Sequence, residues 1–179
     1  MPAVFNKLGI SFTYPENWSL DETETLEGGG SVSVYSPGGA FWSVSLHPPT
    51  ARPEELVRAA VAALRETYDE MDEEPVEEEH LGRRLVGADV NFYCLDLTNT
   101  ALVRSFVAPA CVGLILCQAD DRELPAIEPV FRAMTLSLMQ GFARQAASDF
   151  VMFHDRATAA EGAFHELDDA PPAEDDEDA

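Results

Sequence analysis

Residues 9–18 decide the fold of this chain, and they read GISFTYPENW from Gly9 to Trp18. Apolar residues alternate with small or polar ones at Ile10, Phe12 and Tyr14. This is the period of a half-buried strand. Pro15 ends the strand because it has no N–H to donate to a neighbouring strand. Trp18 is therefore expected to fold back under the turn and to bury its ring in the core.

The same stretch resembles the opening motif G-I-x-F-x-Y-P-x-x-W of the PsbP-like proteins. That family includes the photosystem oxygen-evolving P subunit, a Ran-binding nuclear import factor and uncharacterised bacterial proteins. Residues 129–137, PVFRAMTLS, resemble the family's closing helix F-x-x-h-x-x-S, where h is apolar. The likeness spans about residues 3–138. It implies an α+β fold, an antiparallel β-sheet flanked by helices on both faces (an α/β/α sandwich), and a role in binding or assembly.

Most of the chain up to residue 118 has the pattern of a sheet. Alternating runs between turn residues predict strands over residues 4–8, 10–14, 31–35, 40–46, 83–87, 88–96, 101–107 and 111–118. Glycine-rich turns at 28–30 and 37–39 separate the early strands. The run from Leu114 to Leu116 is apolar throughout, which is typical of a central strand covered on both faces.

Two helices are expected around these strands. Pro53 suits a first helical position, and an apolar stripe at helical spacing continues from there to Met71. The eight acids within residues 69–79 predict a solvated loop that runs into a strand near residues 76–81. The last helix is expected over residues 125–136. Pro129 should begin a fresh turn there, because a proline within a helix costs roughly 3 kcal/mol.

The family resemblance ends at Leu138 and so implies a domain at residues 1–138, followed by an added helical segment at 139–167. The composition then sets apart an acidic tail at 168–179. The tail has no aromatic or β-branched residue and is predicted to be disordered. Alanines favour helix in the segment before it. That segment also carries six large apolar residues, which we take as a candidate protein-interaction surface: Phe142, Phe150, Val151, Phe153, Phe164 and Leu167.

Charge and cysteine content narrow the choice of partners. The chain has 33 acids and 11 bases and a formal net charge of −22, so we expect neither nucleic acid nor an anionic membrane as a partner. A basic protein fits better, and self-association through residues 139–167 is a second possibility.

The N-terminus shows no secretion signal. The odd number of cysteines suits a reducing cytoplasm.

Sequence motifs for metal or nucleophilic chemistry are missing. There is no Cys-x-x-Cys, His-Glu-x-x-His or Gly-x-Ser-x-Gly, and the acidic run lacks the pattern of a calcium-binding loop. We therefore expect no metal, no cofactor and no catalytic residue. Cys111 and Cys117 should share one face of a strand as small buried residues. A pairing of Cys94 with His47 stays open, because sequence does not show proximity.

These observations favour a non-enzymatic protein-binding or assembly module. The alternative is a small-molecule-binding protein or an enzyme with a pocket between the sheet and a helix, which convergent polar groups would reveal. A third interpretation is an acidic sink for a basic partner, whose binding would weaken steeply with salt.

Overall fold

The computed structural model describes the backbone of residues 1–24 and 29–165, and the side chains of residues 1–23 and 29–147. The described elements are mostly strands, followed by one long helix. In chain order they are β1 (Ala3–Lys7), β2 (Ile10–Tyr14), β3 (Ser19–Glu24), β4 (Gly30–Tyr35), β5 (Phe41–His47), α1 (Pro53–Thr67), β6 (Met71–His80), β7 (Arg83–Cys94), β8 (Leu97–Val107), β9 (Val112–Asp120) and α2 (Leu124–His165).

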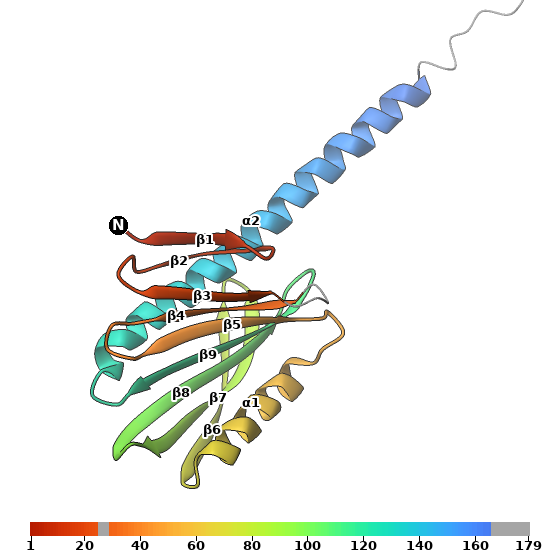
Figure 1. Ribbon diagram of the computed structural model, residues 1–179. Helices are drawn as coiled ribbons and strands as arrows, with labels where there is room; N and C mark the ends of the chain where they lie inside the picture. The colour runs from red at the N-terminus through yellow and green to blue at the C-terminus, as the bar shows by residue number, and fades with distance from the viewer. Residues whose placement is uncertain (25–28, 166–179) are drawn as a thin grey trace, which may run out of the picture. The chain divides into compact units, whose positions relative to one another are not determined.

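Seven strands form one antiparallel sheet in the order β3-β4-β5-β9-β8-β7-β6 (Figure 1). The first two strands, β1 and β2, form a separate hairpin. Two antiparallel meanders, β3–β5 and β6–β9, join where β5 pairs with β9, from Phe41 opposite Gln118 to His47 opposite Val112. The expected α+β class with an antiparallel sheet is confirmed.

The turn after β2 places Trp18 as the sequence predicts. The backbone N–H of Trp18 donates to the carbonyl of Pro15 at 3.0 Å, which closes the turn. The indole is only 8% exposed. It meets the ring of Phe131 edge-on, with 6.2 Å between ring centroids. The chain therefore turns back at Pro15 and anchors itself with one large apolar ring.

The two sequence motifs that resemble the PsbP-like family are in contact in the structure. Phe131 and Met134, both apolar positions of the closing motif, are buried in the same cluster as Phe12. The hydroxyl of Ser137, the last residue of that motif, accepts a hydrogen bond from the backbone N–H of Thr13 at 2.9 Å. The Thr13 hydroxyl lies 3.0 Å from the same oxygen. Each motif thus supplies the packing partners of the other.

Alternate residues of the central strands belong to two different core clusters. Ile115 and Cys117 of β9 lie in the larger cluster with the residues of β2 and α2. Leu114 and Leu116 pack against the smaller one, which contains Val57 and Val61 of α1. Because side chains alternate between the two faces of a strand, these two clusters meet β9 on opposite faces. The apolar stripe of α1 is confirmed, although the helix ends at Thr67.

The two edge strands differ from the sequence prediction. The strand expected near residues 76–81 is present, but it begins earlier: β6 runs from Met71 to His80 and pairs along its length with β7, so most of residues 69–79 are strand and not a solvated loop. The strand β3 was not predicted at all. Both lie at edges of the sheet, where each has a single neighbour, and there acidic side chains and Pro75 discourage pairing with further strands. The prediction failed because alternation of apolar residues marks strands with one buried face, and an edge strand buries few of its side chains.

The end of the chain is one helix where two were expected. The helix α2 continues through Pro129 instead of beginning a fresh turn there. Met139 and Phe142 lie in the large core cluster, with 1% and 5% of their surface exposed. The compact unit accordingly extends from Met1 to Ala143, five residues beyond the expected boundary, and Arg144–Ala179 forms a second unit.

Glycine at position 141 allows a close helix–strand approach inside the first unit. A Cβ at Gly141 would lie 2.3 Å from the backbone oxygen of Ser11 in β2, a distance that real Cβ atoms do not show. The helix can therefore rest directly on the strand only where it has no side chain. This contact helps to explain why the core continues past Leu138.

Three hairpins use two-residue turns in which both residues have positive φ: Leu8-Gly9, Leu81-Gly82 and Leu95-Asp96. Such turns match the twist of the flanking strands, but a leucine in the left-handed region is strained. The predicted strand over 88–96 therefore ends at Cys94, and residues 83–94 form one strand.

Leu81→Asn is expected to stabilise the protein by about 1 kcal/mol, because asparagine tolerates the left-handed region and precedes a glycine here. Leu81 is 60% exposed, so little burial is lost. Urea unfolding of the variant measures the gain. Leu81→Ala keeps the strain and should show no gain. An equal gain in both variants would contradict the role of backbone strain.

Candidate functional site

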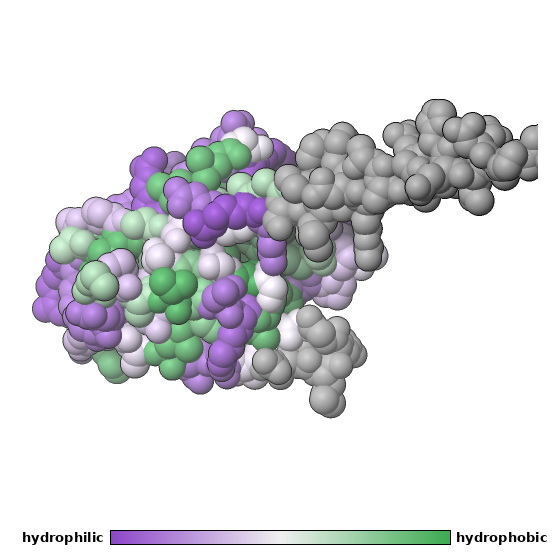
Figure 2. All heavy atoms as spheres, turned by 90° about the horizontal axis from the view of Figure 1, so that it is seen from above, coloured by the Kyte–Doolittle hydropathy of each residue, from purple (hydrophilic) through white to green (hydrophobic). Residues whose placement is uncertain are grey.

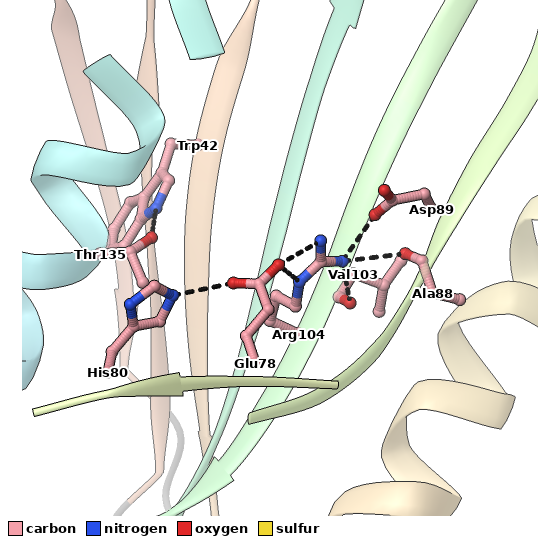
Figure 3. A network of polar contacts seen from close by, with 8 residues as sticks. All are labelled: Trp42, Glu78, His80, Ala88, Asp89, Val103, Arg104 and Thr135. Carbon is pink, nitrogen blue, oxygen red and sulfur yellow. Dashed lines mark hydrogen bonds and ion pairs between the residues drawn. The ribbon is translucent and has the colours of Figure 1, made fainter. Parts of the chain in front are cut away.

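Four charged or titratable side chains gather on neighbouring strands of the sheet, and we call Glu78, His80, Asp89 and Arg104 the polar cluster. Glu78 and His80 come from the edge strand β6, Asp89 from β7 and Arg104 from β8 (Figure 3). Arg104 is 9% exposed although it carries a full charge. Buried charges persist in proteins only where they are paired and hydrogen-bonded.

The Arg104 guanidinium meets this requirement on two sides. Its Nε donates to Glu78 Oε1 at 2.8 Å, and Nη2 lies 2.7 Å from the same oxygen. Its Nη1 donates to the carbonyl oxygens of Val103 and Ala88 at 3.0 and 3.3 Å. The same nitrogen lies 2.8 Å from Asp89 Oδ1, an ion pair whose angles fall short of a hydrogen bond.

His80 extends the polar cluster toward α2. Its Nε2 lies 2.8 Å from Glu78 Oε2, so Glu78 bridges the imidazole and the guanidinium (Figure 3). Burial alone would raise the pKa of Glu78, but hydrogen bonds from Arg104 and His80 outweigh it and lower that pKa. Burial likewise opposes the charge on Arg104, and Glu78 and Asp89 outweigh it and raise the pKa of Arg104. Both groups are therefore charged at neutral pH.

A glycine opposite Arg104 makes room for this side chain. Gly87 pairs with Arg104 across β7 and β8. A Cβ there would lie 2.8 Å from Arg104 Cδ and closer still to the carbonyl oxygen of Val103. The sequence motifs did not reveal this site. The signal available was a single arginine within an otherwise apolar or small stretch, ALVRSFV at residues 101–107, which marks a buried charge.

A cavity of about 290 Å³ adjoins the polar cluster between the sheet and α2. Its lining includes Glu78, His80, Arg104, Cys117, Arg132 and Thr135. The Thr135 hydroxyl also accepts a buried hydrogen bond from Trp42 Nε1 at 3.1 Å. This volume is at the lower end for small-molecule sites, which span roughly 300–1,000 Å³. The cavity could hold a small polar molecule, although most donors of Arg104 are already engaged.

A second, more open hollow lies between the N-terminal hairpin and α2. It has a volume of about 570 Å³ and a mainly apolar lining that includes Tyr14, Pro15, Val130 and Met134. On the face shown in Figure 2, hydrophobic residues are dispersed among hydrophilic ones.

The cysteines and His47 do not form a catalytic pair. Burial raises the pKa of Cys117 and, less strongly, of Cys111, so both thiols stay protonated. Cys117 is buried in the large core cluster as expected, whereas Cys111 lies just before β9 and is only partly buried against that cluster. His47 lies opposite Val112 and hydrogen-bonds Ser45, 3.0 Å away. Cys94 lies opposite Leu97, at the other end of the strands. The pairing of Cys94 with His47 that sequence left open is therefore wrong.

The six candidate interaction residues have different outcomes. Phe142 is buried in the core and contacts the ring of Phe106, with 5.7 Å between ring centroids. Phe150, Val151, Phe153 and Phe164 lie in α2, where the backbone alone is described, and Leu167 lies outside the described residues. The predicted disordered tail, 168–179, also lies outside them.

The described part of the chain has neither a cluster of metal-ligating side chains nor a membrane-spanning helix. Among the residues whose side chains are described, 1–23 and 29–147, no group of three or more His, Cys, Asp or Glu side chains could hold a metal ion. Within residues 1–24 and 29–165, no helix is long and apolar enough to cross a membrane.

The comparisons with known proteins give structural neighbours. No family model and no curated protein matches the sequence. The fold is similar to that of cyanobacterial PsbP. The solution structure of CyanoP from Synechocystis sp. PCC 6803 superposes with a TM-score of 0.53 and 12% identity, over 76% of this chain and 89% of that one. At this identity the likeness concerns the fold alone.

Two further structures match with lower scores. PA94 of Pseudomonas aeruginosa, a protein of unknown function, has a TM-score of 0.47 and 12% identity over 76% of this chain and 95% of its own. LpqN of Mycobacterium tuberculosis, involved in cell envelope biogenesis, has a TM-score of 0.41 and 12% identity over 75% of this chain and 80% of its own. Neither adds an argument about function.

Glu78→Gln is expected to lower the free energy of unfolding at neutral pH by about 1–3 kcal/mol, because a buried charge loses its charged partner. The folded pKa of Glu78 lies below its ordinary value of 4.5. The stability that the ionised Glu78 side chain contributes is therefore fully present at pH values above 4.5, and it is lost as the pH falls through the pKa of Glu78 in the folded protein. Urea unfolding near pH 7 and near pH 3 measures the difference between wild type and variant.

The difference should shrink at the lower pH. Glu79→Gln changes the neighbouring exposed acid and is the matched control, for which little effect is expected. A Glu78→Gln effect of the same size at both pH values would contradict the electrostatic explanation.

Proposed function

We propose that this protein is a non-enzymatic protein-binding or assembly module that binds through the part of α2 beyond Ala143. One observation carries the proposal. A single helix, Leu124–His165, belongs to both units of the chain, with its first part in the core of Met1–Ala143. Its sequence beyond Ala143 includes Phe150, Phe153 and Phe164. Each large apolar side chain gains roughly 1.5–3 kcal/mol when it is buried, so such a helix favours a partner.

The test compares the full chain with a chain that ends at Ala143, both used as bait in native lysate at equal concentration. A protein retained by the full chain alone supports the proposal. Binding of another protein through this segment would be contradicted if both chains retain the same proteins. It would also be contradicted if the full chain retains nothing except further copies of itself. Near-ultraviolet circular dichroism of Trp18 and Trp42, both buried in the first unit, checks that the shorter chain is folded.

The net charge of the chain limits the class of partner that it can bind. With a net charge of −22, the partner is a basic protein or a second copy whose apolar contacts outweigh repulsion, and neither nucleic acid nor a membrane. The three free thiols support a cytoplasmic location. If binding is mainly electrostatic, as for an acidic sink, raising the salt from about 0.05 to 0.5 M should release the partner.

We also propose membership of the PsbP-like family and the finer architecture of an α/β/α sandwich. The contact between the two family-like motifs supports membership, through the hydrogen bond from Thr13 to Ser137 and the packing of Trp18 on Phe131. The two core clusters, one with α1 and one with α2, support the sandwich.

A small-molecule site is the second candidate function, and the cavity beside the polar cluster favours it. Convergent polar groups and a buried ion pair in one hollow are features of ligand sites. A thermal-shift screen with small carboxylates and small amines tests it. Stabilisation that Arg132→Ala abolishes would support a ligand site there. The same stabilisation in wild type and Arg132→Ala would place the ligand elsewhere.

A further inference from the structure

The second part of α2 carries apolar residues at alternating intervals of three and four. From the end of the first unit onward these positions are Ala143, Ala146, Phe150, Phe153, Ala157, Ala160 and Phe164. This is the a/d repeat of a coiled coil, and α2 is helical throughout this range. Where side chains are described, at Ala143 and Ala146, the stripe is exposed. Polar residues fill most of the remaining positions; Val151 and Met152 lie outside the stripe.

We propose that this stripe pairs with the same stripe of a second copy of the chain, as an antiparallel two-helix coiled coil centred on Asp155. The inference names the partner of the segment to which the proposed function assigns binding, and it rests on that proposal. The stripe has a property that favours a copy of itself over an unrelated helix: its large and small residues are arranged so that two copies complement each other.

In the antiparallel register centred on Asp155, each large residue faces a small one. Phe153 faces Ala157 of the second copy, Phe150 faces Ala160, and Phe164 faces Ala146. Each layer between Ala146 and Phe164 then holds one phenylalanine and one alanine, and Ala143 lies outside the paired range. Such layers have nearly equal volume, which lets two straight helices pack at constant separation.

A parallel pair would place identical residues opposite each other. Layers with two phenylalanines at 150 and 153 would be followed by layers with two alanines at 157 and 160. The helices would have to separate and approach again within about 10 Å of their length, at 1.5 Å per residue. Close packing tolerates neither the excess volume nor the voids.

The charges beside the stripe weakly oppose this choice. A parallel pair would bring Asp149 near His154 and Arg156 near Glu161 of the second copy, whereas the antiparallel register brings two Arg156 side chains together. Exposed ion pairs contribute little to stability, and salt screens them. Overfilling an interface layer or leaving a void in it changes the stability of the pair more than these exposed charges do, so packing decides the orientation.

The area that the pair would bury reaches the lower limit of specific interfaces. Each copy contributes three phenylalanines, and each phenylalanine can bury about 150–250 Å². Six rings therefore bury on the order of 1,000 Å², the size at which specific interfaces begin. The interface would lie within the second unit of each chain, Arg144–Ala179.

The first test is the mass of the full chain in solution by sedimentation equilibrium. The wild type is expected at twice the chain mass of 19.6 kDa. Phe153→Glu should raise the dissociation constant of the pair by at least about 30-fold, as for a buried hot-spot residue. Met152→Glu introduces the same charge one residue away but off the stripe, and it should leave the pair intact. A monomeric wild type, or equal loss in both variants, would overturn the proposal.

The second test fixes the orientation by disulfide formation under mild oxidation. His154→Cys brings two thiols together only in the antiparallel register, and Ala146→Cys only in a parallel pair. Linked chains are expected for His154→Cys and not for Ala146→Cys, with the wild type, which keeps its native cysteines, as the control. The opposite pattern would overturn the antiparallel arrangement.

These outcomes separate this inference from the proposed function. A monomeric wild type that still captures another protein through residues 144–179 overturns self-pairing and leaves the binding module standing. A monomeric wild type that captures nothing through those residues overturns both.

Discussion

A chain that ends after Leu138 is expected to lose its cooperative fold, whereas a chain that ends after Ala143 is expected to keep it. The shorter chain lacks Met139 and Phe142, which are almost fully buried in the large core cluster. Removing a buried methionine or phenylalanine side chain costs about 2–5 kcal/mol each. Together they approach the whole stability of a domain, about 5–15 kcal/mol.

Thermal unfolding followed by near-ultraviolet circular dichroism measures the effect. The five residues between the two end points include Gly141, whose contact with Ser11 would be lost as well. A cooperative transition at the same temperature in both chains would show that these residues are not part of the core. It would also place the boundary at Leu138, where the family resemblance ends.

Trp18→Ala is expected to cost about 3–5 kcal/mol of the free energy of unfolding, as for other large aromatic residues removed from a core. The indole is buried, packs edge-on against Phe131 and closes the turn that follows β2. The substitution therefore removes one of the contacts through which the opening segment holds α2. Urea unfolding measures the loss.

Trp18→Phe is the matched control, because it keeps an aromatic ring against Phe131. We expect it to cost less than half as much. If Trp18→Ala costs less than about 1 kcal/mol, the ring is not a core element and the packing of the turn on α2 contributes little.

The parts of the fold that sequence predicted are those with strong periodic burial. The strand at Ile10–Tyr14 and the apolar stripe of α1 follow from alternation or helical spacing alone, and the burial of Trp18 follows from the turn at Pro15. Edge strands follow other rules. The acidic strands β3 and β6 form because their backbones hydrogen-bond to β4 and β7. Backbone pairing does not depend on apolar side chains, so the sequences of β3 and β6 show no alternation of apolar residues.

The polar cluster was not predictable from motifs. Arg104, Glu78 and Asp89 come from three strands, and only the register brings them together. The end of the domain was missed for a similar reason. Met139 and Phe142 look like the start of an added segment until Gly141 is seen to let α2 rest on β2.

The central claim is that the chain combines a folded unit, Met1–Ala143, with a helical segment whose role is to bind. The most direct test is sedimentation equilibrium of the full chain beside the chain that ends at Ala143. We predict that the full chain forms a complex of two copies and that the shorter chain is a folded monomer. Equal association states for the two folded chains would contradict a binding role for the helix in self-assembly.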